Sequence, residues 1–517
     1  MFWFWPRGKL TKHLFSHHPL NKHSIYLSFL IDPVFAPTQK RRLCMNTSET
    51  EATPGRKIQI PGDLFSRTYK LKDQKLASII YRTRNQTVAL LEGDSAAVWQ
   101  RIWDANGATQ SALDYIIQNG AFTQNAEQET AAVLSQFITS LHQRNILGDR
   151  IPQSRITQIN TVKNAIDANN SLTARFAQKL ADNHIFHNLV LETTYRCNEK
   201  CVHCYLPENT RIPNLTLAQI DGLFGEFRDL GGLNILLTGG ELLTRPDILE
   251  IFALTKKHRL LPSLISNLTL LNDETLAALA ELNPKSVGCS IYSTRPELHD
   301  AITQVPGSLQ KSLDAIKRLR AAGLPVIIKT PLMKATAPHW RELSALATQL
   351  GCAIQFDLSI TAKNDGKLSP LAQRVTDTAL IREIFTSEYY NLAISGEQLA
   401  EMRGPHPDAG LCGAGATGLV VGPQGEIRPC IGLCISIGRY PRDSLTQVWR
   451  NSPFFEEFSK LRATDVKECR NCPDFACCIR CPGAWHAEHG SYTKPCEYTC
   501  FLGHQLAEAQ RTRSTNN

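Results

Sequence analysis

The sequence lacks an apolar run long enough to cross a membrane. The stretch SIYLSFLI near the start covers only residues 24–31, and the acidic Asp32 follows it at once. A transmembrane helix needs about 20 predominantly apolar residues. We therefore expect no membrane-spanning segment and no membrane partner.

Net positive charge is also low over most of the chain, although the formal net charge of the whole chain is +8. Residues 1–44 hold seven Lys or Arg and one acidic residue; this net charge of +6 leaves +2 for residues 45–517. Proteins that bind nucleic acid need a basic face. The charge distribution therefore argues against a nucleic-acid partner.

The basic first 44 residues have two interpretations. They begin MFWFWPRGKL and are poor in acid, as targeting segments can be. Alternatively, translation begins at Met45, where the polar stretch MNTSETEATPGRK starts. The second interpretation is favoured. We expect residues 1–60 to be an extension that is disordered or belongs to a misassigned start.

Cysteine is absent from long parts of the chain and dense in two places. Of the 16 cysteines, three lie between Cys197 and Cys204 and ten between Cys412 and Cys500. A secreted disulfide scaffold is short and carries its cysteines throughout. Two dense groups in a long chain indicate metal or iron–sulfur sites in a reducing compartment. Because iron–sulfur clusters are sensitive to oxygen, we expect a cytoplasmic protein.

Residues 61–148 predict a small domain of three strands followed by three helices. The runs RTYKL, LASIIYR and TVALLEG are of β type and are separated by polar residues. Three helical patterns follow, the first with Asp94 or Ser95 as its N-cap. This order is typical of a winged-helix-like α+β domain. Eight basic and eight acidic residues leave it without net charge, which argues against DNA binding.

Strand and helix patterns alternate after a polar, partly helical linker at residues 149–187. Such alternation indicates parallel β/α construction, and six units predict a partial (β/α)6 barrel over residues 188–360. Thr216 is a predicted helix N-cap. Residues 361–411 form a polar connecting region. The predicted strands are residues 188–194, 233–238, 263–267, 286–291, 325–330 and 353–358.

The first cysteine group follows the first predicted strand and lacks a fourth member nearby. Cys197, Cys201 and Cys204 are separated by three and by two residues. A tetrahedral metal site takes four ligands, so either a remote residue completes a zinc site or one position stays open. The spacing resembles the signature of the radical SAM enzymes.

This resemblance implies a specific cofactor chemistry. The three thiolates would bind three irons of a [4Fe–4S] cluster, and the fourth iron would bind the amino and carboxylate groups of S-adenosylmethionine (SAM). An electron from a donor such as flavodoxin or ferredoxin would cleave SAM and yield a 5′-deoxyadenosyl radical that takes hydrogen from the substrate. The protein would supply geometry and exclude water.

The motif LTGGE ends the second predicted strand, at the same rim as the three cysteines. Two glycines often mark only a turn, but they also let backbone approach a ligand closely, and a carboxylate accepts hydrogen bonds from an ammonium group. The resemblance assigns Gly239, Gly240 and Glu241 to SAM. Ser290 on the fourth strand is a further candidate, although its polarity also suits an ordinary strand position. Leu268 stands where the family often has a glycine.

The second cysteine group, at residues 412–505, resembles a SPASM domain, which carries two auxiliary [4Fe–4S] clusters; residues 506–517 are a tail. Cys412, Gly425 and Cys430 have the spacing of its opening. The stretch CRNCPDFACCIRC departs from the family pattern by one residue. Tandem zinc ribbons are the alternative. The expected ligands are Cys412, Cys430, Cys469, Cys472, Cys478, Cys481, Cys496 and Cys500, with Cys434 and Cys477 as possible alternatives. Two choices stay open: Cys477 or Cys478, and Cys496 or Cys500 as the last ligand.

Residues 61–148 resemble the PqqD-like recognition element of ribosomal-peptide maturation systems. The resemblance rests on LLEGDSAAVWQRIW and on the helix that ends LHQRNIL. In that family the leader of a precursor peptide adds as a strand to the sheet edge, beside the third helix. The alternative is a small structural or dimerisation domain. The implied contact residues are Thr87, Val88, Leu90, Val133 and Phe137.

The three resemblances together imply a radical SAM/SPASM enzyme that takes hydrogen from a ribosomally synthesised precursor peptide. Expected products are a thioether or C–C cross-link, or an epimerised residue. One alternative is a sulfatase maturase, in which an Asp follows the second SPASM cysteine, whereas Ile431 stands there in this chain. An alternative of another class is a non-catalytic iron–sulfur or zinc binding protein.

Overall fold

The computed structural model describes residues 29–30, 58–83, 87–119, 126–143, 146–147, 176, 179–207, 214–387, 410–475, 478 and 480–515. The chain divides into two compact units, of which the smaller draws on residues 11–156 and 170–179 and the larger contains residues 180–517. Within the described ranges, no helix is long and apolar enough to cross a membrane.

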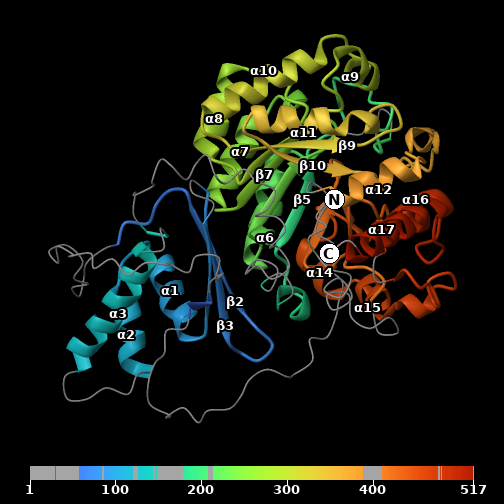
Figure 1. Cartoon of the computed structure of the whole chain (residues 1–517). Helices are drawn as coiled ribbons and strands as arrows, with labels where there is room; N and C mark the ends of the chain where they lie inside the picture. The colour runs from blue at the N-terminus through green and yellow to red at the C-terminus, as the bar shows by residue number, and fades with distance from the viewer. Residues whose placement is uncertain are drawn as a thin grey trace. The chain divides into compact units, whose positions relative to one another are not determined.

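The smaller unit is an antiparallel sheet with three helices, drawn in blue to cyan in Figure 1. The predicted order of three strands and three helices is confirmed. A further two-residue strand, β1 (Phe29–Leu30), comes from the predicted extension and gives the strand order β1–β4–β3–β2. The other elements are β2 (Leu64–Lys70), β3 (Leu76–Arg82), β4 (Thr87–Glu92), α1 (Asp94–Asp104), α2 (Gln110–Asn119) and α3 (Ala126–Gln143).

One face of this sheet packs against the helices. Successive residues of a strand point to opposite faces, and Ala89 and Leu91 of β4 share a buried core with Trp99, Leu134 and Phe137. This common core makes the strands and helices one cooperative unit.

The start of α1 differs slightly from the prediction. Gly93 is the N-cap with φ 58°, and Asp94 is the first helical residue. Glycine adopts this left-handed backbone conformation without steric cost, which explains why the turn precedes Asp94 rather than including it.

The larger unit contains six parallel strands in sequential order, as the predicted partial barrel requires. Each strand pairs with the next along the chain, and the order continues as β10–β9–β8–β7–β6–β5. The strands are β5 (Asn188–Glu192), β6 (Asn234–Thr238), β7 (Leu261–Ser266), β8 (Ser286–Ser290), β9 (Val326–Pro331) and β10 (Ala353–Asp357).

Amphipathic helices connect these strands. In α6 (Leu217–Asp229), the residues Ile220, Phe224 and Phe227 are buried against the sheet, and Thr216 caps the helix in a capping box with Gln219, as predicted. Cys289 and Cys352, outside the two cysteine groups, are buried in the same core. The other helices are α7 (Ile248–Lys257), α8 (Asp273–Leu282), α9 (Pro296–Thr303), α10 (Ser308–Ala321) and α11 (Trp340–Gln349).

The cysteine-rich region adds three short strands to this sheet, which the sequence did not predict. β11 (Gly418–Val421) pairs parallel with β5, and β12 (Glu426–Arg428) and β13 (Gly438–Arg439) follow. A Cβ at Gly418 would lie 2.6 Å from the carbonyl oxygen of Asn188, so glycine permits this close pairing. Strands of two to four residues are too short to show a periodic pattern.

Among its described residues, the larger unit contains five further helices. The last of them begins at Glu497 and continues through most of the predicted tail, to Thr515. They are α12 (Thr378–Thr386), α14 (Leu445–Asn451), α15 (Pro453–Lys460), α16 (Pro482–His489) and α17 (Glu497–Thr515).

Candidate active site

The first three cysteines lie in the loop that follows β5, residues 193–207, which we call the first cysteine loop. All three are free thiols. The backbone N–H of Glu199 donates to Cys197 Sγ at 3.4 Å, and the N–H of Cys204 donates to the carbonyl oxygen of Cys201 at 3.0 Å. Cys201 Sγ lies 3.8 Å from the hydroxyl of Tyr292, just beyond β8. The loop therefore meets the rim of the sheet at a second strand.

The thiols of this loop favour their protonated form in the absence of metal. Burial raises the pKa of Cys197 to about 11 and also raises the pKa of Cys201 and of Cys204. The charge of Glu199, and to a lesser extent those of Cys204 and Cys197, raise the pKa of Cys201 further. Metal binding drives off the thiol proton.

These thiols have the chemistry of iron–sulfur cluster ligands. Iron–sulfur clusters are held by cysteine thiolates, and a cluster of several irons spreads its thiolates more widely than one ion does. Three neighbouring free thiols on one loop suit that arrangement.

Gly239 and Gly240 bring the end of β6 against the first cysteine loop. A Cβ at Gly239, whose φ is 140°, would lie 2.3 Å from the carbonyl oxygen of Thr194; one at Gly240 would lie 2.6 Å from that of Arg196. The N–H of Gly240 donates to the Thr194 carbonyl at 2.7 Å. The two glycines thus let the end of β6 pack closely against the backbone just before Cys197.

Glu241 is fully buried, and three donors share its carboxylate. Oε1 accepts from the backbone N–H of Leu243 at 2.9 Å and from the hydroxyl of Ser266 at 2.7 Å, and Oε2 accepts from the N–H of Asn267 at 2.7 Å. Burial raises the pKa of Glu241. A carboxylate offers about four acceptor sites, so these bonds join β6 to β7 and leave room for one further donor.

Two other predicted positions lie on the same rim. Ser290 ends β8 and interacts with Tyr292, which reaches Cys201. Leu268 follows β7 with φ 64° and a buried side chain. This backbone conformation favours glycine, so a glycine at this position would adopt it with less strain than Leu268 does.

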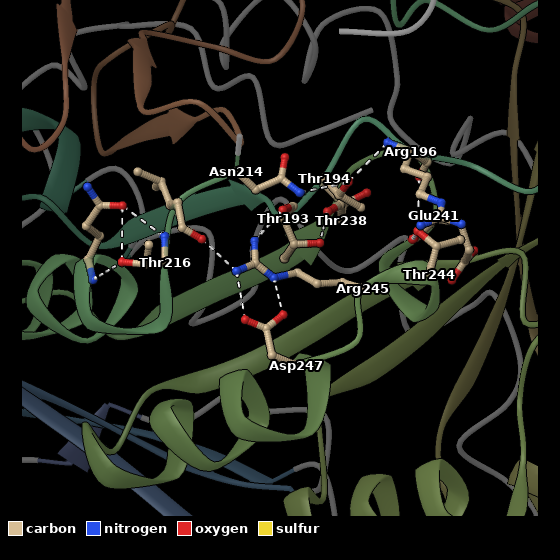
Figure 2. A network of polar contacts seen from close by, with 12 residues as sticks. Thr193, Thr194, Arg196, Asn214, Thr216, Thr238, Glu241, Thr244, Arg245 and Asp247 are labelled. Carbon is tan, nitrogen blue, oxygen red and sulfur yellow. Dashed lines mark hydrogen bonds and ion pairs between the residues drawn. The ribbon is translucent and has the colours of Figure 1, made fainter. Parts of the chain in front are cut away.

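Arg245 belongs to this site, although the sequence pattern did not indicate it. Its guanidinium donates to the carbonyl oxygens of Thr193 at 2.8 Å and Leu215 at 2.6 Å, and pairs with Asp247 at 2.6 Å (Figure 2). A surface hollow of about 570 Å³ lies alongside, lined by residues 214–218 and 245–247. Arg245 therefore fixes the start of the first cysteine loop; its one sequence signal is its place shortly after LTGGE.

Glu192 and Arg428 form a second network that the sequence pattern did not indicate. Glu192 ends β5 and is completely buried, and it pairs with the buried Arg428 of β12. Tyr195 and Tyr205, near the two ends of the cysteine triplet, also bond to Glu192. The first cysteine loop and the cysteine-rich region are thus joined through one carboxylate.

The predicted auxiliary ligands fall into two neighbourhoods. In the first, burial raises the pKa of Cys412, and the charges of Cys430 and Cys481 raise it further. The backbone N–H groups of Ala414, Gly432 and Ala484 donate to Cys412, Cys430 and Cys481, each at 3.4 Å. Thiolates that bind iron–sulfur clusters accept such hydrogen bonds.

The second neighbourhood contains four cysteines. Burial raises the pKa of Cys469 to about 12, and the charges of Cys478, Cys500 and Cys472 raise it further. Cys496 interacts with one member of each neighbourhood, Cys481 and Cys500.

The two alternative ligands differ in what can be said of them. Cys434 Sγ lies 3.8 Å from Nη1 of Arg428. Cys477 lies outside the described residues. The structure therefore places Cys478 with the second neighbourhood and leaves the choice between Cys477 and Cys478 a prediction.

The residues predicted to bind a peptide lie on β4 and α3. Val88 is half-buried on β4, whereas Leu90 is 3% exposed and Phe137 is 1% exposed in the core. Thr87 begins β4, and Val133 packs against the core from α3. β1 pairs with β4 opposite Leu90 and Leu91, so part of the predicted edge already has a strand beside it.

Comparison with known families identifies the two cysteine groups. Residues 191–344 match the radical SAM superfamily, and residues 412–473 match the SPASM iron–sulfur cluster-binding domain. These matches favour iron–sulfur sites over a zinc site at the first cysteine group and over tandem zinc ribbons at the second.

Curated relatives share the same region at low identity. The AdoMet-dependent heme synthase of Oleidesulfovibrio alaskensis is 24% identical over 327 residues, which cover 58% of this chain and 84% of the relative. The PqqA peptide cyclase of Methylocella silvestris is 28% identical over 311 residues, which cover 57% and 82%.

A solved structure resembles almost the whole fold. Streptococcus suis SuiB bound to its precursor peptide SuiA superposes with a TM-score of 0.56, covering 86% of this chain and 99% of SuiB. The two sequences are 16% identical, so the likeness is one of fold.

Proposed function

Since this chain is a radical SAM enzyme with a SPASM domain, we propose that it modifies a ribosomally synthesised precursor peptide. Its cofactors are SAM with a [4Fe–4S] cluster and the auxiliary clusters of the SPASM domain. The expected products are a thioether or C–C cross-link, or an epimerised residue.

The residues of the first cysteine loop hold the SAM cluster in this proposal. Cys197, Cys201 and Cys204 bind it, and the cluster with SAM supplies the radical that takes hydrogen from the peptide. Arg245 and the Gly239–Gly240 pair fix the loop backbone. Glu241 uses its remaining acceptor site to orient the SAM ammonium group.

The auxiliary clusters are assigned to the two neighbourhoods of cysteines. Cys412, Cys430 and Cys481 bind one cluster, and Cys469, Cys472, Cys478 and Cys500 bind the other. Cys496 and Cys434 are the candidates for the position left open in the first set. A flavodoxin or ferredoxin is the proposed electron donor.

One observation supports a peptide as the substrate: a separate sheet-and-helix unit precedes the radical SAM domain in the chain. The named relatives include both a heme synthase and a peptide cyclase, so the cluster-binding domains do not select the substrate. In the smaller unit, β4 lies between β3 and the two-residue β1, and its Ala89 and Leu91 share a core with Leu134 and Phe137 of α3. Extended peptides bind the edges of sheets by main-chain hydrogen bonds.

The position of β1 sharpens this proposal. It runs antiparallel to β4 and pairs only with Leu90 and Leu91. We expect a leader peptide to run in the same direction and to pair with Thr87, Val88 and Ala89 as well, displacing β1 or extending beyond it. Its residues opposite Ala89 and Leu91 should be apolar, because directly opposite side chains share a face.

The test begins with anaerobic purification and a short peptide encoded beside the gene. About 12 irons per chain are expected for three four-iron clusters, together with SAM cleavage to 5′-deoxyadenosine that Cys201→Ala abolishes. The peptide should bind the full chain and be modified, and Val88→Pro, which removes a backbone donor from β4, should weaken binding without affecting uncoupled SAM cleavage. A peptide that is modified equally well by Val88→Pro would contradict the proposed binding edge.

A further inference from the structure

Glu192 is a completely buried carboxylate that gathers donors from two distant parts of the chain. The hydroxyl of Tyr205 donates to Oε1 at 3.3 Å, and the hydroxyl of Tyr195 lies 2.9 Å from Oε2. Arg428 of β12 pairs with Oε2 through Nη2. The side chain of Arg428 is only 5% exposed, so the ion pair is shielded from water.

These donors flank cysteines of both groups. Tyr195 lies two residues before Cys197, and Tyr205 directly follows Cys204. Arg428 lies two residues before Cys430. The carboxylate of Glu192 therefore holds both ends of the first cysteine loop and the approach to the first auxiliary neighbourhood.

Arg428 also reaches a sulfur. Its Nη1 donates to Cys434 Sγ at 3.8 Å, while Nη2 bonds Glu192. The guanidinium is thus placed between a carboxylate on the side of the first cysteine loop and a thiol of the cysteine-rich region. Its positive charge and the negative charge of Glu192 are displaced toward opposite cysteine groups.

Stability alone does not account for a buried ion pair here. Replacing such a pair by apolar residues of similar volume is often neutral or stabilising. The neighbouring Glu426 shares the hydroxyl of Tyr195, at 2.7 Å, but its Oε2 is buried without a hydrogen-bond partner among the described residues, as is Nε of Arg428. The network therefore retains charge that a purely structural contact would not need.

We propose that the Glu192–Arg428 pair positions the two cysteine regions against each other and tunes the reduction potentials of their clusters in opposite directions. This inference rests on the proposed function, because it requires that the chain binds both the SAM cluster and the auxiliary cluster. Net charge and hydrogen bonds to sulfur set iron–sulfur potentials. The positive charge of Arg428 stabilises the reduced, more negative state of the neighbouring auxiliary cluster. The negative charge of Glu192 destabilises the reduced state of the SAM cluster. Both are positioning residues.

The test is a redox titration of the reconstituted full chain with dithionite, followed by electron paramagnetic resonance. Dithionite gives one electron to each cluster, and the signal that changes when SAM is added identifies the SAM cluster. Arg428→Gln should lower the potential of an auxiliary cluster, and Glu192→Gln should raise that of the SAM cluster. A tenfold change in the reduction equilibrium corresponds to about 59 mV for one electron.

Three further variants keep the result interpretable. Glu192→Gln with Arg428→Gln removes both charges and retains a neutral hydrogen bond, which protects the fold, and both shifts should persist. Arg428→Lys should restore the auxiliary potential. Asp63→Asn with Arg82→Gln removes a buried pair of the smaller unit, joined at 3.1 Å, and should shift neither potential.

The inference would be overturned if the clusters are bound but neither variant changes their reduction potentials. It would also be overturned if Arg428→Gln and Glu192→Gln shift the potentials in the same direction. Neither outcome bears on the peptide substrate, because the titration needs no peptide. Conversely, a failure of peptide binding would leave the opposite shifts of the two potentials in place.

Discussion

The first cysteine loop and the cysteine-rich region hold their thiols in different ways. The loop is fixed by protein groups from the strands around it, including the Gly239–Gly240 contact, Arg245 and Glu192. In the cysteine-rich region, the local core beyond the sheet is small and includes cysteines themselves, with Cys469 and Cys496 buried around Trp485. The first cysteine loop is therefore held by contacts that need no cluster, whereas cysteines proposed as cluster ligands form part of the core of the cysteine-rich region.

This difference teaches where metal binding and folding are coupled. A preformed site gains little structure when its cluster arrives, whereas a region without enough apolar core gains its folding free energy from the metal. We therefore expect loss of iron to affect the two regions unequally, although both join the same sheet.

The largest expected effect comes from damaging the preformed loop. Gly240→Ala places a Cβ 2.6 Å from the Arg196 carbonyl oxygen and 2.7 Å from that of Tyr195, so the backbone before Cys197 must move. A displacement of about 1 Å can reduce a rate roughly 100-fold, and we expect a loss of that order in SAM cleavage, measured as 5′-deoxyadenosine.

A matched glycine provides the control for this substitution. Gly366→Ala also changes a glycine, with φ 83°, but its Cβ would meet nothing within 4 Å. It should retain SAM cleavage within a few fold. Equal activity of both variants would mean that the Gly239–Gly240 contact does not hold the loop.

Removal of iron should separate the two regions directly. Amide hydrogen exchange after chelation should show lost protection in α16 and in residues 463–475, because their thiol ligands no longer bind metal. The parallel strands β5 to β10 should keep their protection, since their core is apolar. Uniform loss of protection across both regions would contradict the comparison.

Much of the larger unit could be predicted from sequence because its signals are periodic or spaced. The six parallel strands follow from alternation, and the first cysteine loop follows from three cysteines after a strand and LTGGE on the next. Both signals are local, so one sequence is enough to place them on the same rim.

Contacts between distant segments could not be predicted in this way. Arg245 acts through backbone carbonyls, which carry no sequence signature. The pair of Glu192 with Arg428 joins residues 236 positions apart. β11 is too short for a periodic pattern and owes its place to pairing with β5. Such features depend on the tertiary fold rather than on the residues nearby.

We expect a smaller effect, on stability, from substitution of Glu241, whose carboxylate joins β6 to β7. Glu241→Gln replaces an acceptor oxygen by an amide nitrogen and leaves buried donors without a partner, either the N–H of Asn267 or the N–H of Leu243 together with the hydroxyl of Ser266. An unsatisfied buried donor costs about 1–3 kcal/mol, measurable in chemical unfolding of the larger unit. Ser266→Ala leaves Oε1 of Glu241 with the N–H of Leu243 but takes away the acceptor of the buried Leu268 N–H, which lies 2.9 Å from the Ser266 hydroxyl, so its cost should be of similar size.

The smallest effects provide the sharpest version of the comparison, because the two regions contain the same helix cap. Thr216 caps α6 beside the preformed site, and Ser444 caps α14 in the cysteine-rich region, each in a capping box with Gln at the third helical position. Replacing such a cap by Ala costs about 1 kcal/mol when the helix is folded. Thr216→Ala should therefore lower the free energy of unfolding by this amount with and without iron. Ser444→Ala should do so as well, because Leu445, Val448 and Trp449 of α14 pack in the apolar core of the parallel sheet and not in the core around Cys469, Cys496 and Trp485. Hydrogen exchange in each helix, with and without chelator, measures both costs; a cost at Ser444 that disappears without iron would show that the metal dependence extends beyond the core around Trp485.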